Sequence, residues 1–290
     1  MQVQQWAARM LLVSSVALGV PTVAAGQDRN RSGNAVTHWN TIGARLMVDP
    51  GPVLGGRAFA IFHAAIHDAV NGVERRYEPY TADLSFPGAS LDAAVATAAR
   101  DVLVAFSPTR QAEIEAEYTA ALSAIPDGPA EAEGVILGRL CAQANVDRRI
   151  DDGIATVNEP AYVPTGEPGD YDFTPPFDAP PLGPTAFYPG FGRLTPFIID
   201  VAKHRVHGPD RLSGFLYTFD FNLLKSIGSV DSSIRNADQT EIAYFWSEEA
   251  ELIWNRIANA ILRDRDAEMP GRRHASWPSS ISRSTTQVLR

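Results

Sequence analysis

Apolar residues recur every three or four positions along most of this chain, and that spacing constrains its fold more than any other feature. The clearest segment is Arg57–Val73, where the recurring residues are Phe59, Phe62, Ile66, Ala69 and Val73. This period places apolar side chains on one side of an α-helix, whereas a strand would need alternation. The same pattern predicts further helices at about Leu91–Phe106, 107–125, Ala130–Gly153, Asp210–Leu224 and Asp238–Leu262. Because the sequence has no strand-rich region and no internal repeat, we expect an all-α helical bundle.

Two of these helices have recognisable start signals. Ser107 offers a capping hydroxyl, and Pro108 follows it in the first turn, where a missing N–H costs nothing. Asp238 is the expected cap of the last helix. The buried side of that helix should hold Ile242, Phe245, Trp246, Ile253, Ile257 and Ala260.

Between the helical segments lies a stretch of different composition, Glu159–Phe197, which contains ten prolines and seven Tyr or Phe residues before its final Phe197. Proline denies the segment regular hydrogen bonding, while the rings offer apolar anchors that a simple linker would lack. We expect a long ordered loop laid across the helices. It could cover an active site or serve as structural wrapping, and its length favours function only modestly.

The first residues have the pattern of an export signal. Arg9 and the amino terminus precede the ten-residue apolar stretch Leu11–Val20, and Val23-Ala24-Ala25 offers small residues for cleavage after Ala25. The stretch is too short to span a bilayer comfortably, although an uncleaved membrane anchor is the alternative. We expect residues 1–25 to be a signal peptide, residues 26–38 a flexible N-terminus, and the mature protein to be periplasmic or secreted, with no membrane span.

The charge balance and the single cysteine narrow the partners and the source of stability. The formal net charge is −9, which argues against nucleic acid or anionic lipid as a partner. Cys141 is the only cysteine, so no internal disulfide can form and packing must provide the stability. Because Cys141 falls among the apolar positions of an expected helix, we interpret it as a buried small residue.

Three titratable residues stand out on the Arg57–Val73 helix: His63, His67 and Asp68. Histidines four residues apart share one helix face, so both imidazoles could reach one metal ion. No Glu stands between them as a general base, and a zinc site would need a third ligand that the sequence does not identify. The alternative is that both histidines make buried hydrogen bonds to other parts of the fold.

A smaller cluster surrounds Arg205, flanked by His204 and His207 and close to Lys203. It could attract an anion, although a solvated loop end explains the same residues. The chain has no Gly-x-Ser-x-Gly elbow, no Walker loop and no Gly-x-Gly-x-x-Gly turn. Serine hydrolases, nucleotide hydrolases and dinucleotide enzymes are therefore unsupported.

Two passages resemble a known family. The first is Arg57-Ala-Phe-Ala-Ile-Phe-His-Ala-Ala-Ile-His-Asp-Ala-Val-Asn-Gly followed by Tyr77-Glu-Pro-Tyr80. The second is Phe219-Asp-Phe-Asn-Leu-Leu-Lys-Ser-Ile-Gly-Ser229, continued by 232–246 and Trp254-Asn255. Together they are similar to bacterial vanadium-dependent haloperoxidases and the related phosphatidic-acid-type phosphatases. The Pro-rich stretch with Pro196-Phe197 also fits, and the resemblance covers roughly Trp39 to Ala260.

The resemblance implies an α-helical enzyme that binds vanadate or phosphate. In the family the oxyanion is held by a Lys–Arg-Pro motif, a Pro-Ser-Gly-His motif and a Ser-Arg…His motif. A highly charged oxyanion needs several cationic donors, and a histidine serves as acid, base, axial ligand or phosphorylated nucleophile. The implied chemistry is peroxide-dependent halide oxidation or phosphate-ester hydrolysis; the sequence does not specify the small-molecule substrate.

The chain departs from the family at these motifs. It contains no Arg-Pro dipeptide and no Ser-Gly-His, and Ser282-Arg283 has no histidine after it. Its only lysines are Lys203 and Lys225, and neither has the required pattern. The family motifs follow the region that matches Trp254-Asn255, whereas residues 263–290 form an Arg- and Ser-rich tail with little helical period.

We expect a helical domain at 39–262 and a divergent, disordered tail at 263–290. The departures from the family lead to three hypotheses. The first is a truncated or frameshifted homologue, inactive alone and without bound vanadate, whose uncovered faces at Ile242, Phe245 and Ile253 favour self-association. The second is a non-catalytic helical binding or scaffold protein. The third is a metal-dependent enzyme that uses His63, His67 and Asp68.

Overall fold

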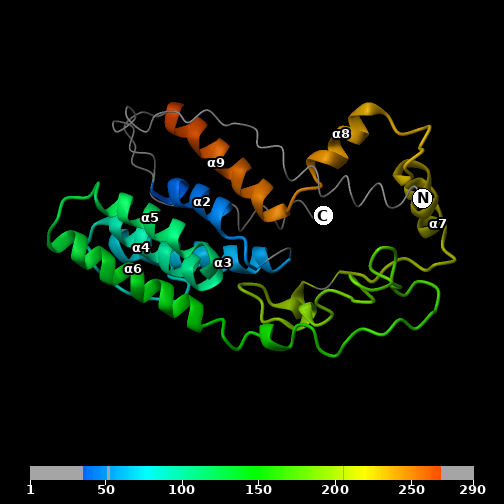
Figure 1. Ribbon diagram of the computed structural model, residues 1–290, viewed down its shortest axis with the longest axis horizontal. Helices are drawn as coiled ribbons and strands as arrows, with labels where there is room; N and C mark the ends of the chain where they lie inside the picture. Colours follow the sequence, from blue (N-terminus) through cyan, green and yellow to red (C-terminus); the bar gives the residue numbers. More distant parts are fainter. Residues whose placement is uncertain (1–34, 51–52, 205, 269–290) are drawn as a thin grey trace. The chain divides into compact units, whose positions relative to one another are not determined.

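The described part of the chain is helical, as the sequence predicts. The computed structural model describes residues 35–50, 53–204 and 206–268, and no strand occurs among them. The α-helices are α2 (Ala35–Leu46), α3 (Leu54–Glu74), α4 (Leu91–Phe106), α5 (Gln111–Leu122), α6 (Pro129–Asp147), α7 (Phe215–Gly228), α8 (Ala237–Phe245) and α9 (Ala250–Glu268) (Figure 1). Short 3-10 helices lie at Pro108–Arg110, Ile154–Thr156, Phe191–Arg193 and Val201–Lys203. The expected signal peptide, residues 26–34, Arg205 and residues 269–290 lie outside the described residues.

The core is built on α3, α4 and α6, with α2 and α5 packed against α4. Its largest fully buried side chains include Trp39, Phe62, Leu103, Ile114 and Leu137. The apolar positions that predict α3 and α4 are the ones that face this core, since Phe59, Phe62, Ile66, Val95 and Val102 are all buried. Cys141 is also buried, as expected, and burial raises the pKa of its thiol to about 12.

Two glycines allow α4 and α6 to approach closely. A Cβ atom added at Gly134 would lie 2.6 Å from the carbonyl oxygen of Ser90, and one at Gly138 would lie 2.4 Å from that of Ala94. Both distances are far inside van der Waals contact, so the backbones can lie this close only with glycine on α6. The facing residues of α4, among them Ala93 and Ala94, are fully buried and small for the same reason.

Several predicted element bounds are wrong. α2 begins at Ala35, inside the stretch 26–38 that we expect to be flexible. α6 ends at Asp147 rather than Gly153, and α7 runs from Phe215 to Gly228 rather than from Asp210 to Leu224. α9 continues to Glu268, past the expected start of the tail at residue 263.

The expected last helix, Asp238–Leu262, is two helices. α8 ends at Phe245, where the Ser247 hydroxyl donates to the Tyr244 carbonyl oxygen at 2.7 Å and competes with the next helical turn. Glu251 then lies in the first turn of α9, where a carboxylate favours a helix start. The cap of α8 is Asn236 and not Asp238, in a reciprocal capping box with Gln239.

Ser107 also has a different role from the expected one. Its side chain makes no helix-capping bond, and its hydroxyl oxygen accepts from the backbone N–H of Val48 at 3.1 Å and of Asp49 at 3.4 Å. Asp49 in turn accepts from the backbone N–H of Thr109 at 3.0 Å and from its hydroxyl group, and these hydrogen bonds lower the pKa of the Asp49 carboxyl. The residues around Ser107 therefore join the end of α2 to the start of α5.

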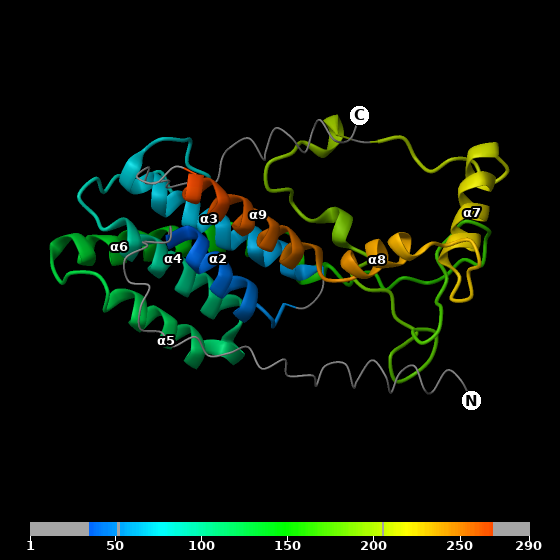
Figure 2. The same ribbon diagram turned by 90° about the horizontal axis from the view of Figure 1, so that it is seen from above.

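The last helix of the described chain packs back onto its first. α9 lies beside α2 and α3 in both ribbon views (Figures 1 and 2). On α9, Leu252 packs against the core, and Ile253 is buried. By contrast, α7 and α8 contain no buried residue. The predicted buried side is therefore wrong for Ile242, Phe245 and Trp246, which are at least half exposed, and for Ala260, which is exposed.

Candidate functional site

Asp68 is fully buried on α3 and makes four hydrogen bonds. Its carboxylate accepts from the backbone N–H of Tyr80 at 2.6 Å, of Thr81 at 3.0 Å and of Ala82 at 3.0 Å, and from Asn145 Nδ2 at 2.8 Å. One turn later, Asn71 binds both backbone groups of Tyr77. Asp68 therefore folds the segment after α3 back onto the helix, a task that an ionised acceptor performs well.

The two histidines of the same helix contact different parts of the fold. His63 Nε2 lies 3.2 Å from Asn255 Oδ1 on α9, and His67 Nε2 lies 2.9 Å from the Glu78 carbonyl oxygen. Because Asn255 Nδ2 donates to the Glu251 carbonyl oxygen, Asn255 Oδ1 is the atom that accepts from His63. Burial lowers the pKa of His63 to about 4, against the raising effect of the Asn255 hydrogen bond.

His63, His67 and Asp68 thus have separate partners rather than a common centre. Within the described ranges no group of three or more His, Cys, Asp or Glu side chains is placed to hold a metal ion. The His63 contact with α9 agrees with the interpretation that the histidines make hydrogen bonds inside the fold, whereas the His67 hydrogen bond is exposed rather than buried. In the basic cluster, Lys203 pairs with Asp200 at 3.4 Å and His204 Nδ1 lies 2.8 Å from the Asp200 carbonyl oxygen, both on exposed side chains.

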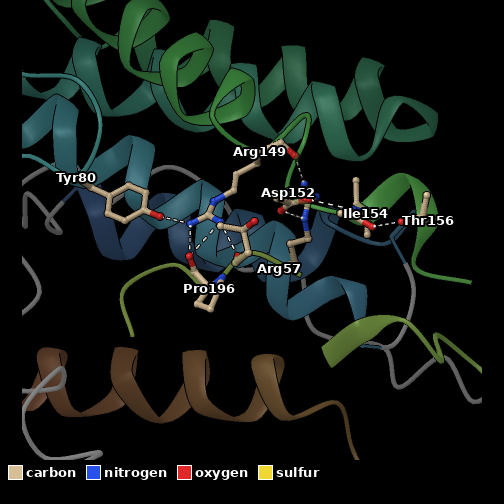
Figure 3. Close-up of polar contacts among 9 residues, drawn as sticks. Arg57, Tyr80, Arg149, Asp152, Ile154, Thr156 and Pro196 are labelled. Atoms are coloured by element: carbon tan, nitrogen blue, oxygen red, sulfur yellow. Dashed lines mark hydrogen bonds and ion pairs between the residues drawn. The ribbon is translucent and has the colours of Figure 1, made fainter. Parts of the chain in front are cut away.

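A buried cluster of Arg57, Arg149 and Asp152, called the node below, joins the end of α6 to the Pro-rich loop (Figure 3). Its centre is Arg149, which is 3% exposed. The Arg149 guanidinium donates to the Thr195 carbonyl oxygen at 2.9 Å, to that of Pro196 at 3.4 Å and to the Tyr80 hydroxyl. It also lies over the Phe197 ring, 3.6 Å from its centroid. Of the guanidinium nitrogens of Arg149, Nε lacks an acceptor among the described residues.

The second half of the node is an ion pair between α3 and the turn after α6. Arg57 Nε donates to Asp152 Oδ2 at 2.8 Å, and their side chains are 10% and 2% exposed. Arg57 Nη2 donates to the Arg149 carbonyl oxygen at 2.7 Å. The Asp152 carbonyl oxygen accepts from the backbone N–H of Thr195 at 2.8 Å. Arg57, Arg149 and Asp152 therefore fix residues 195–197 against the helices.

The loop that we expect across the helices is anchored mainly at its ends. Besides residues 195–197, the Gly190 N–H donates to the Val157 carbonyl oxygen at 2.7 Å, and Arg193 donates to the Glu159 carbonyl oxygen. Between these points most residues from 160 to 187 are exposed. The aromatic side chains there mainly contact one another, as in the group of Tyr162, Tyr171 and Phe173.

A polar seam holds α9 against α2 and α3. Asn40 Nδ2 donates to Asn259 Oδ1 at 2.9 Å, and Asn259 Nδ2 donates to Thr41 Oγ1 at 3.0 Å. Asn40, Asn255 and Asn259 are buried, and His63 contacts the same seam through Asn255. These hydrogen bonds join specific residues, so they fix the register of α9 more narrowly than apolar contacts would, although Asn40 Oδ1 lacks a donor among the described residues.

The α7–α8 pair carries the main exposed apolar surface among the described helices. We name as the α7–α8 surface the residues Phe215, Leu216, Phe219, Phe221, Leu223, Leu224, Ile242, Tyr244, Phe245 and Trp246, which are between 42% and 81% exposed. Arg235 joins the two helices, because its guanidinium donates to the carbonyl oxygens of Ile227 and Ser229 at the end of α7 and to Thr240 Oγ1 on α8. The surface is therefore held in a defined local geometry although it is uncovered.

Comparison with family models, with curated proteins and with solved structures finds no match to this chain. None of the described helices is both long and apolar enough to span a membrane.

Sequence reasoning missed Arg149 and Asp152 as partners of the first resembling passage. The available signal was a basic pair, Arg148 and Arg149, just after a helical segment and followed by acidic residues.

Proposed function

We propose that this chain is an exported helical scaffold of the vanadium haloperoxidase and phosphatidic-acid-type phosphatase kind, in which residues 35–268 build no oxyanion-binding centre by themselves. Its role is then non-catalytic: it presents a rigid helical unit rather than turning over a halide or a phosphate ester.

The observation that carries this proposal is the convergence of separate resembling segments on the buried node. Arg57 begins the first passage, Tyr80 ends it, and Pro196-Phe197 belongs to the Pro-rich stretch. All three meet at Arg149 and Asp152. Residues of the passages that resemble the family thus lie together at one buried site, and this contact supports the proposal that the two passages belong to one helical unit of that kind.

The chemistry of the same node argues against oxyanion binding there. A vanadate or phosphate ion needs several convergent cationic donors. Arg57 is paired with Asp152, and Arg149 donates to two carbonyl oxygens and a hydroxyl group. Of the Arg149 guanidinium nitrogens, only Nε lacks an acceptor among the described residues. Lys203 and Lys225, the only lysines, are exposed on different elements.

The direct test is enzymatic. Purified protein is incubated with orthovanadate, hydrogen peroxide and bromide, and separately with an aryl phosphate, beside a vanadium bromoperoxidase and a phosphatase as positive controls. We expect rates equal to those of protein-free buffer. Turnover that depends on both vanadate and protein, or phosphate release proportional to protein concentration, would refute the proposal.

A further inference from the structure

α9 is held to the core by an interface that is largely polar. Leu252 is partly buried against the core and Ile253 is buried, whereas the hydrogen bonds to α2 and α3 run through the buried Asn255 and Asn259. The two preceding helices, α7 and α8, contain no buried residue. Among the described helices that follow the Pro-rich loop, α9 is therefore the one that attaches this part of the chain to the core.

Two acceptors buried at this interface have no donor. They are Asn40 Oδ1 on α2 and Glu251 Oε1 in the first turn of α9, and neither has a hydrogen-bond partner among the described residues. A buried acceptor without a donor costs free energy, which water recovers when the interface opens. Docking of α9 is therefore less favourable than a fully paired polar interface would make it.

Glu251 places its carboxylate against the first turn of α3. A Cβ added at Gly55 would collide with Glu251 Oε1, so the carboxylate occupies the space that glycine leaves free. The N-cap residue of α3, Val53, makes no side-chain capping bond. A carboxylate at the positive end of a helix dipole is stabilised while it is ionised. The first turn of α9 is therefore attracted to α3 by charge.

His63 places a titratable ring in the middle of the same interface. Its Nε2 lies 3.2 Å from Asn255 Oδ1, and its ring contacts those of Phe59 and Phe62 on its own helix, with centroids 6.3 and 5.1 Å away. Burial in these surroundings lowers the pKa of His63 to about 4. Docking of α9 therefore favours the neutral ring.

The charged groups of the neighbouring helices do not offset a proton on His63. Those on the described parts of these helices are Glu251 and Arg256 on α9, His38 and Arg45 on α2, and Arg57, His67, Asp68 and Glu74 on α3. Glu251 lies one turn before Asn255, against Gly55, and Arg256 pairs with Glu248. His38 and Arg45 are exposed. None of these groups contributes to the shift in the His63 pKa, so a protonated His63 is a buried cation without a nearby counter-charge.

We infer that α9 is a latch that acid releases: it leaves α2 and α3 as a unit, together with α7 and α8, while the helices α2 to α6 stay folded. Because the His63 pKa rises from about 4 in the docked state to its ordinary value of 6.5 on release, release takes up a proton and becomes more favourable as pH falls below 6.5. The equilibrium constant for release should rise roughly 20-fold from pH 7 to pH 5. The inference does not depend on the proposed function, since it concerns a helix interface and no oxyanion.

Hydrogen exchange of the full chain tests the inference. Mass spectrometry at pH 7 and at pH 5 gives the protection factors of α9, α4 and α6, and these factors correct for the effect of pH on the intrinsic exchange rate. A helix released from its packing frays in water, so its amides exchange. We expect α9 to be protected at pH 7, but at least about tenfold less than α4 and α6 at both pH values. Its protection factors should fall roughly 20-fold at pH 5.

Two histidine variants identify the titrating group. His63→Gln can still donate to Asn255 Oδ1 but cannot titrate, so it should remove most of the fall in α9 protection between pH 7 and pH 5. The matched control is His67→Gln on the same helix, whose ring bonds the Glu78 carbonyl oxygen instead, and it should keep the fall. Each variant is compared with itself at the two pH values, and α4 and α6 report whether it is folded.

Three results would overturn the inference. Equal protection of α9 and α4 would show that α9 opens only when the whole fold unfolds. Absence of α9 protection at pH 7 would show that the helix is not docked in solution. A fall in protection that persists in His63→Gln would show that this histidine does not control release.

Discussion

Removing the carboxylate of Asp152 should destabilise the protein more than breaking any exposed ion pair. Asp152→Ala leaves the Arg57 guanidinium buried without its partner, 10% exposed, and close to the second arginine of the node. Breaking a buried pair on one side costs about 3–5 kcal/mol. That is a large part of the 5–15 kcal/mol by which domains are usually stable. At roughly 2–4 °C per kcal/mol for a chain of this size, the melting temperature should fall by about 10 °C.

A double-mutant cycle separates the lost pair from other effects of the substitution. Arg57→Met removes the cation while keeping an unbranched apolar stem, so Asp152→Ala combined with Arg57→Met should be more stable than Asp152→Ala alone. The matched control is Glu117→Ala, which breaks the 2.6 Å pair with Arg45, whose side chain is 51% exposed. That change should cost less than about 1 kcal/mol.

The measurement is urea unfolding followed by circular dichroism at pH 7, with all four variants under the same conditions. The reasoning about the node is refuted if Asp152→Ala costs no more than Glu117→Ala. It is also refuted if the two node substitutions are additive.

Three further outcomes follow from individual contacts. Asp68→Asn replaces an acceptor of four hydrogen bonds by a group that also donates. It should lower the free energy of unfolding in urea by about 2–4 kcal/mol. A decrease of less than about 0.5 kcal/mol would contradict that role. Gly138→Ala should lower the free energy of unfolding by at least about 1–3 kcal/mol, because its Cβ would lie 2.4 Å from a carbonyl oxygen of α4. Gly192→Ala is its control, since a Cβ there meets no atom within 4 Å. The pKa of His63 falls from 6.5 in the unfolded chain to about 4 in the fold, so its contribution is complete above pH 6.5 and is lost as pH falls toward 4. The wild type should therefore lose about 2 kcal/mol between pH 7 and pH 5 that His63→Gln does not lose, and equal pH profiles would contradict this.

The helices of the core were predictable from the sequence because each buries one side, and the spacing of apolar residues along the helix marks that side. Leu91–Phe106 is α4 with the predicted bounds, and its apolar period matches the buried face. The prediction failed where burial depends on distant partners. Ile242 and Phe245 follow the same period but are exposed, as the hypothesis of uncovered faces expects. Ile253, which that hypothesis also expected to be exposed, is buried.

The candidate site was less predictable than the fold. Spacing correctly places His63 and His67 on one helix, but it cannot say that Asn255 and the Glu78 carbonyl oxygen are their partners. Asp68, a potential metal ligand by residue type, is occupied by backbone N–H groups whose positions depend on a loop. The node around Arg149 joins residues that are 69 and 46 positions apart in the chain, and no local pattern encodes such contacts.

Ligand-dependent stability tests the central claim most directly. Thermal unfolding is measured over a titration of orthovanadate, with sulfate at equal ionic strength as the control. A site in the folded protein would add about 2.7 kcal/mol at one hundred times its dissociation constant, which corresponds to a rise of roughly 5–10 °C. If residues 35–268 build a scaffold without an oxyanion centre, the melting temperature will be the same in orthovanadate and in sulfate. A saturable rise seen only with orthovanadate would contradict the account.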